Sequence, residues 1–364
     1  MHIVIDARIR PSSTGRYTDR LLQHLQLLDK NNRYTVLLQQ HDTWRPTAKN
    51  FTTLPCPYKQ FSLNPLEQIG FAWKLYRLRP DLVHFTMTQQ PLLYFGKIVT
   101  TTHDLTMLRF TRPGKRSRVV HTLRMAFYRF MFKWSHRKSR SIIVPSKFVR
   151  RDLMKLDPKT RNKITVTYEA SEPPIKAKAQ KPSLISSPFI LHVGSPFPHK
   201  NIDRLIDAFD ILHTADPTLH LVLAGKKEFY FEQLLAKITA SSSSDNIHTT
   251  GFVSDTELKW LYENAECYAL PSLSEGFGLP GLEAMAHGCA LASSNATCLP
   301  EIYGDAALYF DPSNPRDIAA KIQTLFRNKN LRSQLVRRGH ARLADFSWDQ
   351  MAKQTLAVYK SAAR

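Results

Sequence analysis

Short apolar runs alternate with segments of helical periodicity along most of the chain. The strand-like runs are HIVID, YTVLLQ, LVHF, KIVTTTHD and SIIVPS in the first half, and FILHVGS, LHLVLAG, CYALPS and ALASSN in the second. Helical periodicity falls between them, over residues 20–28, 66–77, 202–213 and 231–240. This alternation predicts an α/β protein with parallel sheets covered by helices.

A segment without periodicity, PPIKAKAQKPSLISSP, separates the two halves. Its Pro, Lys, Ala and Ser content is typical of a linker, which we place at residues 173–188. A chain of 364 residues is long enough for two domains. We therefore predict a Rossmann-like domain over residues 1–172 and a second over 189–345, facing each other across a cleft.

The richest candidate chemistry lies in EGFGLPGLEAMAHG, residues 275–288. An apolar run precedes it and a helix-compatible segment from Pro280 follows, so the unit is predicted to be strand, loop and helix. Gly288 suits the left-handed position that ends a helix. Glu275 is expected on the loop and Glu283 in the first helical turn.

The backbone N–H groups of Phe277, Gly278 and Leu279 are expected to point out of this helix start, where a phosphate or an electron-rich oxygen is stabilised. A simpler interpretation is that the two glutamates only complement the helix dipole. The glycines also spell the dinucleotide fingerprint G-x-G-x-x-G. Four residues separate Pro271 from the first glycine, and ALASSN ends without an acidic residue, so we favour a ligand with hydroxyls and a phosphate over a nicotinamide dinucleotide.

Four further places carry candidate chemistry. Lys200 stands at a strand-to-helix turn, where its ammonium can reach a phosphate. Gly15, next to Arg16, permits a close approach of the backbone to a ligand. His103, followed by Asp104, ends a strand at the predicted cleft. Main-chain groups near Val253, which follows another expected strand, are placed to bind a base.

The net charge of +21 is concentrated in the first half. Residues 1–172 carry a net charge of +20, and the stretch from Arg109 to Arg151 holds 14 basic residues and no acidic one. Such a field attracts nucleic acid, an acidic membrane surface or a phosphorylated acceptor. The residues predicted to face a membrane or an acceptor are Arg116, Arg118, Arg124, Phe127, Lys133 and Trp134.

These last residues belong to a predicted basic amphipathic helix, in which Leu123, Phe127, Phe130, Met131 and Trp134 recur at helical spacing. The alternative is that this stripe packs into its own domain and that the basic residues are solvated.

Other patterns limit the class of protein. No apolar run approaches 18 residues, and the chain opens on the strand-like MHIVIDA, so neither a spanning helix nor a signal peptide is expected. The four cysteines form no C-x-x-C pair, which favours buried thiols in a cytoplasm over a zinc site. A nucleic-acid-binding protein would explain the charge, but no zinc finger, helix-turn-helix or aromatic RNP strand is visible.

The chain resembles the retaining nucleotide-sugar glycosyltransferases of family 4, which have the two-domain GT-B fold. The resemblance rests on HVGSPFPHKNIDRLIDAF, LVLAGK, GFVSDTELKWLYENAE, LPSLSEGFGLPGLEAMAHG and LPEIYGDAALYFDP, in the family's order and spacing. TGRYTDRLL and THDLTMLRF are similar to its N-terminal and histidine segments. Residues 346–364 resemble the family's C-terminal helix, which crosses back to the first domain.

The resemblance implies that the second domain binds a nucleotide-sugar and the first an acceptor. Glu283 would hold the ribose, Glu275 and the amides of Phe277, Gly278 and Leu279 the donor sugar and phosphate, and Lys200 the leaving diphosphate. Gly15 would close over the diphosphate with help from Arg16, His103 would face the sugar and Val253 the base. Ser195 stands where many members have an arginine that pairs with the lysine.

The same resemblance implies hexosyl transfer without a metal or other cofactor. GDP-mannose is the favoured donor, with UDP-sugars as the alternative, and the expected acceptor is a glycan or a lipid-linked or phosphorylated molecule. The protein is expected to be cytoplasmic and peripheral on the cytoplasmic membrane face. A sugar-nucleotide epimerase of the same fold is the nearest enzymatic alternative.

Overall fold

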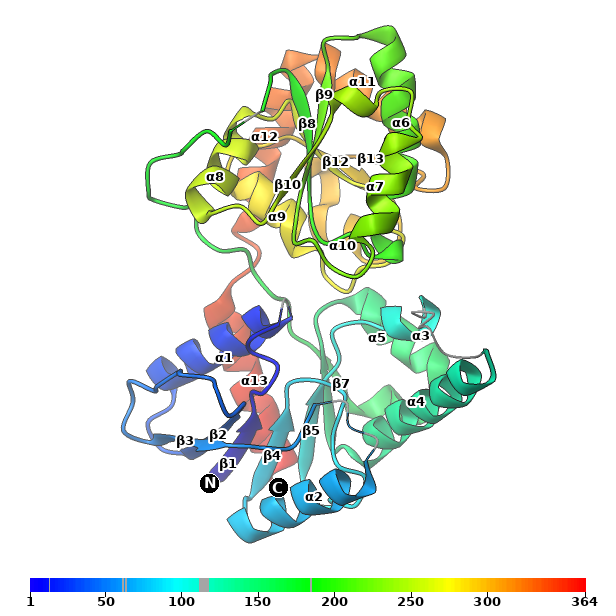
Figure 1. Cartoon of the computed structure of the whole chain (residues 1–364). Coiled ribbons are helices and arrows are strands. Elements are labelled where there is room, and N and C mark those ends of the chain that lie inside the picture. Colours follow the sequence, from blue (N-terminus) through cyan, green and yellow to red (C-terminus); the bar gives the residue numbers. More distant parts are fainter. Residues whose placement is uncertain (13, 61, 63, 111–117, 184) are drawn as a thin grey trace. The chain divides into compact units, whose positions relative to one another are not determined.

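The computed structural model describes residues 1–364 except 13, 61, 63, 111–117 and 184, and leaves out the side chains of 118–121 and 124. The chain divides into two compact units. The first unit comprises Met1–Glu169 together with Ser347–Arg364, and the second comprises Ala170–Phe346 (Figure 1). Each is an α/β unit built on one parallel sheet, as the alternating pattern predicts.

The sheet of the first unit has the strand order β3-β2-β1-β4-β5-β6-β7, and every pairing in it is parallel. Most of its strands are covered on both faces, which explains their nearly continuous apolar runs. The strands are β1 (His2–Asp6), β2 (Arg33–Leu38), β3 (Phe51–Pro55), β4 (Leu82–Phe85), β5 (Ile98–Thr101), β6 (Ser141–Val144) and β7 (Ile164–Val166).

The helices of the first unit include the C-terminal one, α13, which packs against α1. The phenol of Tyr359 on α13 lies 2.6 Å from Nδ1 of the buried His84 on β4, so the end of the chain is tied to the sheet. Helix α1 begins five residues before the predicted start at Arg20. The helices are α1 (Gly15–Leu28), α2 (Pro65–Leu78), α3 (Thr106–Arg109), α4 (Arg118–Lys138), α5 (Lys147–Leu156), η1 (Pro158–Lys163) and α13 (Trp348–Ala362).

The sheet of the second unit has the order β10-β9-β8-β11-β12-β13 and is also parallel throughout. Strands β8 and β11 are neighbours, yet the chain runs outward from them in opposite directions. The strand order therefore reverses between these two strands, and in open parallel sheets this is where ligands bind. The strands are β8 (Phe189–Val193), β9 (His220–Ala224), β10 (Ile247–Gly251), β11 (Cys267–Leu270), β12 (Leu291–Ser294) and β13 (Ala307–Phe310).

The second unit's core lies between its sheet and helices such as α6 and α11, which pack on each other. Residues 173–188 lack helix and strand where the structure describes them, but they lie against this unit, where Lys259 donates to the carbonyls of Ile175 and Ala177. The helices are η2 (Pro198–Lys200), α6 (Ile202–Ala215), α7 (Phe231–Thr239), η3 (Ser244–Asn246), α8 (Asp255–Asn264), α9 (Leu279–Ala286), α10 (Leu299–Tyr303), η4 (Gly304–Ala306), α11 (Pro315–Arg327) and α12 (Lys329–Leu343).

Candidate functional site

Two loops of the second unit meet at the carboxyl ends of β8 and β11. The first runs from Gly194 to Asn201 and the second from Pro271 to Gly278, and the amide of Leu273 in the second donates to the carbonyl of His199 in the first at 2.7 Å. The chain thus brings Lys200 and the glutamate motif, 75 residues apart, to the point where the strand order reverses.

Lys200 and Glu275 form an ion pair, with Lys200 Nζ 2.7 Å from Glu275 Oε1. Their side chains are only 16% and 12% exposed, so the pair is shielded from water but still reachable from it. Burial raises the pKa of the Glu275 carboxyl, and the Lys200 ammonium lowers it by more, so the net pKa lies below its ordinary value. Glu275 is therefore an ionised acceptor at neutral pH, with a cation beside it that can turn to an anionic ligand.

Two glycines of the motif, Gly278 and Gly281, are required by the packing of Tyr303. Gly278 has φ +94°, and a Cβ there would lie 2.4 Å from the Tyr303 hydroxyl; a Cβ on Gly281 would lie 2.4 Å from the Tyr303 ring. The Tyr303 hydroxyl donates to the Gly278 carbonyl at 2.5 Å. A tyrosine from α10 packed under the loop thus accounts for the second and third glycines of the G-x-G-x-x-G spelling.

Helix α9 begins at Leu279, with Gly278 as its N-terminal cap residue and no side-chain cap among the described residues. Pro280 lies in its first turn and Gly288, with φ +72°, follows its end in the left-handed region, both as predicted. The prediction that Glu283 lies in the first turn is wrong, because the helix starts one residue earlier and its first turn holds no acidic residue.

Glu283 nevertheless lies near the same buried tyrosine, Tyr268, as Glu275 does. Tyr262 places its hydroxyl 3.5 Å from Glu283 Oε2. Both glutamates also act on the buried Tyr268: burial first, then the charges of Glu283 and Glu275, hold the pKa of its phenol well above the ordinary value. The Tyr268 hydroxyl donates to the carbonyl of Val193, the last residue of β8, at 3.2 Å. The two glutamates therefore lie close to the end of this strand.

His192, on β8, is a polar residue of this site that the sequence did not indicate. Its Nδ1 lies 2.9 Å from the carbonyl of Ala269, which only accepts, so Nδ1 carries the proton and Nε2 is an acceptor. Burial lowers the pKa of His192 to about 4, and Nε2 has no hydrogen-bond partner among the described residues. A neutral acceptor therefore lies beneath Gly194, the residue before Ser195.

Ser195 and Val253 are half-buried in loops that follow strands of this sheet. The carbonyl of Ser195 accepts from the amide of Phe197 at 2.8 Å, within the turn that leads to Lys200. Val253 lies between Gly251, the last residue of β10, and Ser254, which caps α8 in a capping box with Glu257.

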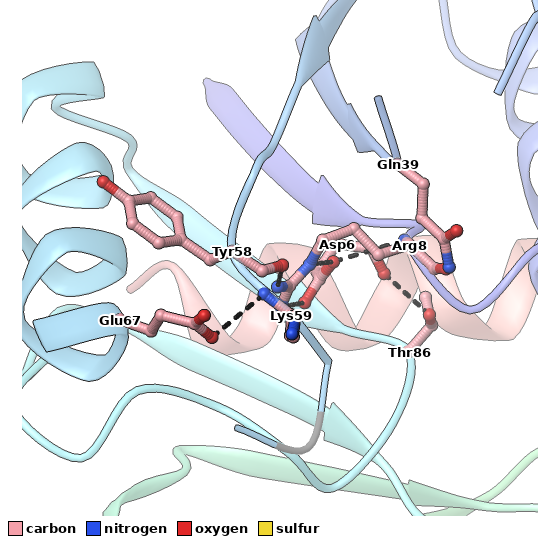
Figure 2. Close-up of polar contacts among 7 residues, drawn as sticks. All are labelled: Asp6, Arg8, Gln39, Tyr58, Lys59, Glu67 and Thr86. Atoms are coloured by element: carbon pink, nitrogen blue, oxygen red, sulfur yellow. Dashed lines mark hydrogen bonds and ion pairs between the residues drawn. The ribbon is translucent and has the colours of Figure 1, made fainter. Parts of the chain in front are cut away.

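In the first unit, Asp6 and Arg8 form a buried network at the carboxyl end of β1. Arg8 donates from Nε and Nη2 to the two Asp6 oxygens at 2.7 and 2.6 Å and from Nη1 to the Tyr58 carbonyl at 2.7 Å (Figure 2). Its guanidinium also lies 4.2 Å from the centre of the Phe71 ring. The hydroxyl of Thr86 donates to the Asp6 carbonyl at 2.7 Å, so the ends of β1 and β4 are joined.

His103 lies beside this network, after β5. Its Nε2 is 3.0 Å from the Thr86 carbonyl and its Nδ1 is 3.1 Å from Glu169 Oε1. A carbonyl and a carboxylate only accept, so both ring nitrogens donate, as in an imidazolium. Burial lowers the pKa of His103, but the bond to Glu169 and its charge raise it by more, so the net pKa is above the ordinary value.

The carboxylate that His103 contacts is thus Glu169, while Asp104 accepts from the amide of Thr106 at 2.7 Å. Glu169 is 66 residues away, and no local sequence signal indicates it. Gly15 makes its close approach to its own loop: a Cβ there would lie 2.0 Å from the Arg10 carbonyl oxygen. Arg16, in the first turn of α1, is half-buried.

The predicted basic helix is α4. Arg116 lies outside the described residues, and Arg118 and Arg124 lie in α4 without a description of their side chains. Phe127 and Trp134 are exposed and Lys133 is half-buried, so this part of the apolar stripe does not pack into the interior of its own unit.

The described residues hold no group of three or more His, Cys, Asp or Glu side chains that could bind a metal ion. The four cysteines are free and buried. Of the helices in the described part of the chain, none is both long enough and apolar enough to cross a bilayer.

Two family models match the chain: Glycosyltransferase Family 4 over residues 14–170, and Glycosyl transferases group 1 over residues 175–342. The O-antigen chain mannosyltransferase B of Escherichia coli is 30% identical over 72% of this chain and 70% of its own length. The O-antigen chain mannosyltransferase RfbU of Salmonella typhimurium is 25% identical over 69% of this chain and 72% of its own.

Among solved structures, Anabaena HepE in complex with UDP-glucose matches with a TM-score of 0.73 and 16% identity, over 99% of this chain and 100% of its own. At that identity the likeness concerns the fold alone. The two matched halves, the mannosyltransferase relatives and the shared fold agree with one another. The chain therefore belongs to glycosyltransferase family 4, has the GT-B fold and is similar to mannosyltransferases.

Proposed function

We propose that the protein transfers a mannosyl group from GDP-mannose to a hydroxyl of a glycan or of a lipid-linked or phosphorylated acceptor, with retention of the anomeric configuration. The observation that carries the proposal is the Lys200–Glu275 ion pair beside the start of α9, where the strand order of the second sheet reverses. It is supported by relatives that are mannosyltransferases. A UDP-sugar is the alternative donor, since HepE was solved with UDP-glucose.

In this proposal each part of the site acts on a different part of the donor. Lys200 turns from Glu275 to the diphosphate and stabilises the charge that develops as the bond to the anomeric carbon breaks. Amides at the start of α9 hold a phosphate oxygen, Glu275 holds sugar hydroxyls and Glu283 holds the ribose. The acceptor oxygen bonds to the anomeric carbon on the face that the diphosphate leaves, and the acceptor proton passes to the departing diphosphate.

No metal is needed in this scheme, because Lys200 and the helix start supply the positive potential. Ser195 in place of an arginine leaves Lys200 as the principal cation of this loop in the proposal. Turnover that is unchanged in EDTA would support this view, and turnover that is lost in EDTA and restored by Mg²⁺ or Mn²⁺ would contradict it.

The donor is tested by thermal shift against GDP, UDP, ADP and their mannose and glucose derivatives. A ligand that binds only the folded state raises the midpoint, and at 100 times its dissociation constant it adds about 2.7 kcal/mol. We expect the largest shift with GDP and GDP-mannose. Product formed with the donor is then analysed by NMR: an inverted anomeric configuration contradicts retention, and conversion of the nucleotide-sugar without an acceptor indicates an epimerase.

We also propose that transfer takes place at the cytoplasmic face of a membrane. The support is the net charge of +20 on residues 1–172, which favours an anionic surface or acceptor.

A further inference from the structure

Helix α2 carries an exposed apolar stripe. Leu66, Ile69, Trp73 and Tyr76 are spaced by three or four residues and are between 48% and 77% exposed. This spacing puts them on one face of the helix. The buried residues of α2, such as Phe71, lie on the opposite side and fill the core of the first unit. Large apolar side chains gathered on one exposed helix face mark an interaction surface.

Helix α4 carries a second stripe of the same kind. Leu123, Phe127, Phe130 and Trp134 repeat at helical spacing and are between 36% and 66% exposed, and the rings of Phe130 and Trp134 stack at 6.2 Å. The face of α4 that packs inward holds the buried His136, whose Nε2 lies 2.6 Å from the hydroxyl of Thr102. The stripe therefore faces outward while a more polar face is buried.

The segment 91–95 joins the two stripes. The Tyr76 hydroxyl of α2 donates to the Leu93 carbonyl at 3.1 Å and accepts from the Phe95 amide at 2.9 Å. From the other side, the Trp134 indole of α4 donates to the Leu92 carbonyl at 3.3 Å. Leu93 and Phe95 are themselves 52% and 63% exposed. The ammonium of Lys138 holds this segment by donating to the carbonyls of Pro91, Leu92 and Tyr94.

The α2 stripe, the segment 91–95 and the α4 stripe thus make one apolar surface on the first unit, which we call the docking surface. Figure 1 shows α2 and α4 as neighbouring helices on one side of this unit.

The charge around the docking surface is mainly positive, although α2 carries Glu67, whose carboxylate accepts from the amide of Lys59. From Leu82 to Arg151, Asp104 is the only acidic residue of the sequence, and its carboxylate accepts from the amide of Thr106. Arg77 lies 4.6 Å from the centre of the Trp73 ring, and Arg129 is exposed on α4 between the aromatic residues of the stripe. Indole and phenol rings beside cations suit the zone between lipid headgroups and acyl chains.

We infer that the docking surface binds an anionic lipid bilayer, with both helices lying in the plane of the headgroups. Apolar side chains of the two stripes then enter the headgroup and acyl boundary while the basic residues contact acidic headgroups. This inference rests on the proposed action at a membrane surface, but it is independent of the donor and of the sugar that is transferred.

The test is sedimentation with vesicles of phosphatidylcholine alone or mixed with phosphatidylglycerol, with the full chain at low and high salt. We expect binding to the mixed vesicles only, and weaker binding as salt rises. The variant Leu66→Ser/Ile69→Ser/Trp73→Ser should reduce the partition coefficient at least about tenfold, because the apolar side chains no longer enter the bilayer. Equal binding to both vesicle types, or unchanged binding by this variant, would overturn the inference.

A matched control replaces three exposed apolar residues that lie elsewhere: Leu27→Ser/Ile211→Ser/Phe229→Ser. It should bind mixed vesicles as the wild type does, and loss of binding in both triple variants would show that the effect is not specific to α2. Quenching of tryptophan fluorescence by brominated lipids gives a second readout, which Trp73→Phe/Trp134→Phe should abolish. Quenching that persists in this variant would contradict the placement of the surface.

Two further measurements distinguish membrane binding from self-association and from a failure of the proposed donor. If the surface instead mediates contact between copies of the chain, sedimentation velocity will show an oligomer that the α2 variant dissociates, with no vesicle binding, and the inference fails. A thermal shift with GDP or GDP-mannose, measured without vesicles, tests the proposed donor independently of membrane binding. Vesicle binding without a thermal shift by the nucleotide would support the docking surface and count against the proposed donor. A thermal shift by the nucleotide without vesicle binding would support the donor and overturn the docking surface.

Discussion

Arg8–Asp6 in the first unit and Lys200–Glu275 in the second are ion pairs at the carboxyl edges of the two sheets, and they differ in how fully they are satisfied. Arg8 and Asp6 are 3% and 4% exposed and two residues apart, and the guanidinium also donates to a carbonyl and covers an aromatic ring. Lys200 and Glu275 are several times more exposed and come from loops 75 residues apart. The first pair is a fully satisfied structural element, and the second has the partial exposure that a ligand site needs.

Removing one partner of each ion pair should therefore have different consequences in the two units. A saturated pair loses stability when one partner is removed, because the other charge stays buried. In the proposed mechanism the Lys200–Glu275 pair exchanges partners during the reaction, so its removal is expected to act mainly on turnover.

The largest expected effect is on stability, in Arg8→Met. The change leaves Asp6 buried without its cation and should cost about 3–5 kcal/mol, which lowers the thermal midpoint of the first unit by about 10 °C. Nucleotide binding, measured by calorimetry, should stay as in the wild type. Arg20→Met is the control, since Arg20 makes its contact with Gln23 on the exposed side of α1. If Arg8→Met were as stable as the wild type, the Arg8–Asp6 pair would not stabilise the first unit.

The next effect is on turnover, in Lys200→Met. Loss of the cation beside the leaving diphosphate should lower turnover by about 10²–10³-fold, as the removal of one charge-stabilising group does in other enzymes. Single-turnover kinetics with saturating donor measure it.

The double variant Lys200→Met/Glu275→Gln should keep the thermal stability of the wild type, since no charge remains buried alone, but should not recover turnover. Lys237→Met is the control in the same unit, because the ion pair of Lys237 with Asp207 is more exposed. Wild-type turnover in the Lys200 variant would remove the contrast between the two ion pairs.

The sequence predicts much of the architecture of this site. The strand, loop and helix around residues 267–288 follow from an apolar run, a proline and glycines, and Lys200 falls after the neighbouring strand by the same alternation. The pattern of hydrophobic and polar residues does not predict contacts between segments that are distant in the sequence. Glu169 reaches His103 from 66 residues away, and Tyr303 approaches the glycine loop from α10. Short strands such as β7, with three residues, are also too brief for a reliable period.

Helix α4 shows a different limit. Its apolar stripe is compatible with a buried face, since amphipathic periodicity predicts that one face differs from the other and not which of them meets the core. The buried face instead contains His136 and, directly after the end of the helix, Ser139, because hydrogen bonds to Thr102 and to backbone carbonyls satisfy their polar atoms.

A smaller effect is expected from Tyr303→Phe, which tests how the glycine loop is held. The ring remains in place under Gly278 and Gly281, but the hydroxyl no longer donates to the Gly278 carbonyl. Loss of one hydrogen bond of about 1 kcal/mol should raise the donor KM about fivefold, with turnover at saturating donor nearly unchanged. Steady-state kinetics over a range of donor concentrations separate the two parameters.

The matched control is Tyr309→Phe, because Tyr309 also donates to a glycine carbonyl, that of Gly304, at 2.7 Å. Both variants lose a similar bond, so a similar decrease in thermal stability is expected, and only the Tyr303 variant should change KM. Equal changes in KM would mean that the Tyr303 bond stabilises the unit without positioning the loop.

The smallest effect concerns pH and contrasts two buried histidines, one from each unit. The pKa of His103 is raised in the fold, so its contribution to stability is fully present below the unfolded value of about 6.5 and is lost as pH rises through the folded pKa. The pKa of His192 is lowered to about 4, so its contribution is present above about 6.5 and is lost as pH falls toward 4. The contribution of His103 should therefore be lost on the alkaline side of pH 6.5, and that of His192 on the acid side. The first unit also holds His84 and His136, whose pKa values burial lowers to about 3 and about 4, so their contributions are lost on the acid side too.

Glu169→Gln sharpens this contrast because it removes the carboxylate but keeps an acceptor near Nδ1 of His103. The His103 pKa, followed by NMR of the imidazole C–H protons, should fall below its wild-type value, since the charge of Glu169 no longer offsets burial and only the smaller effects of the Thr86 carbonyl and Asp104 remain. The loss of stability above pH 6.5, measured by denaturant unfolding, should become shallower. The His192 titration should not move. An unchanged His103 pKa would mean that Glu169 does not hold the imidazolium, and the raised pKa would then have to come from the Thr86 carbonyl and the charge of Asp104.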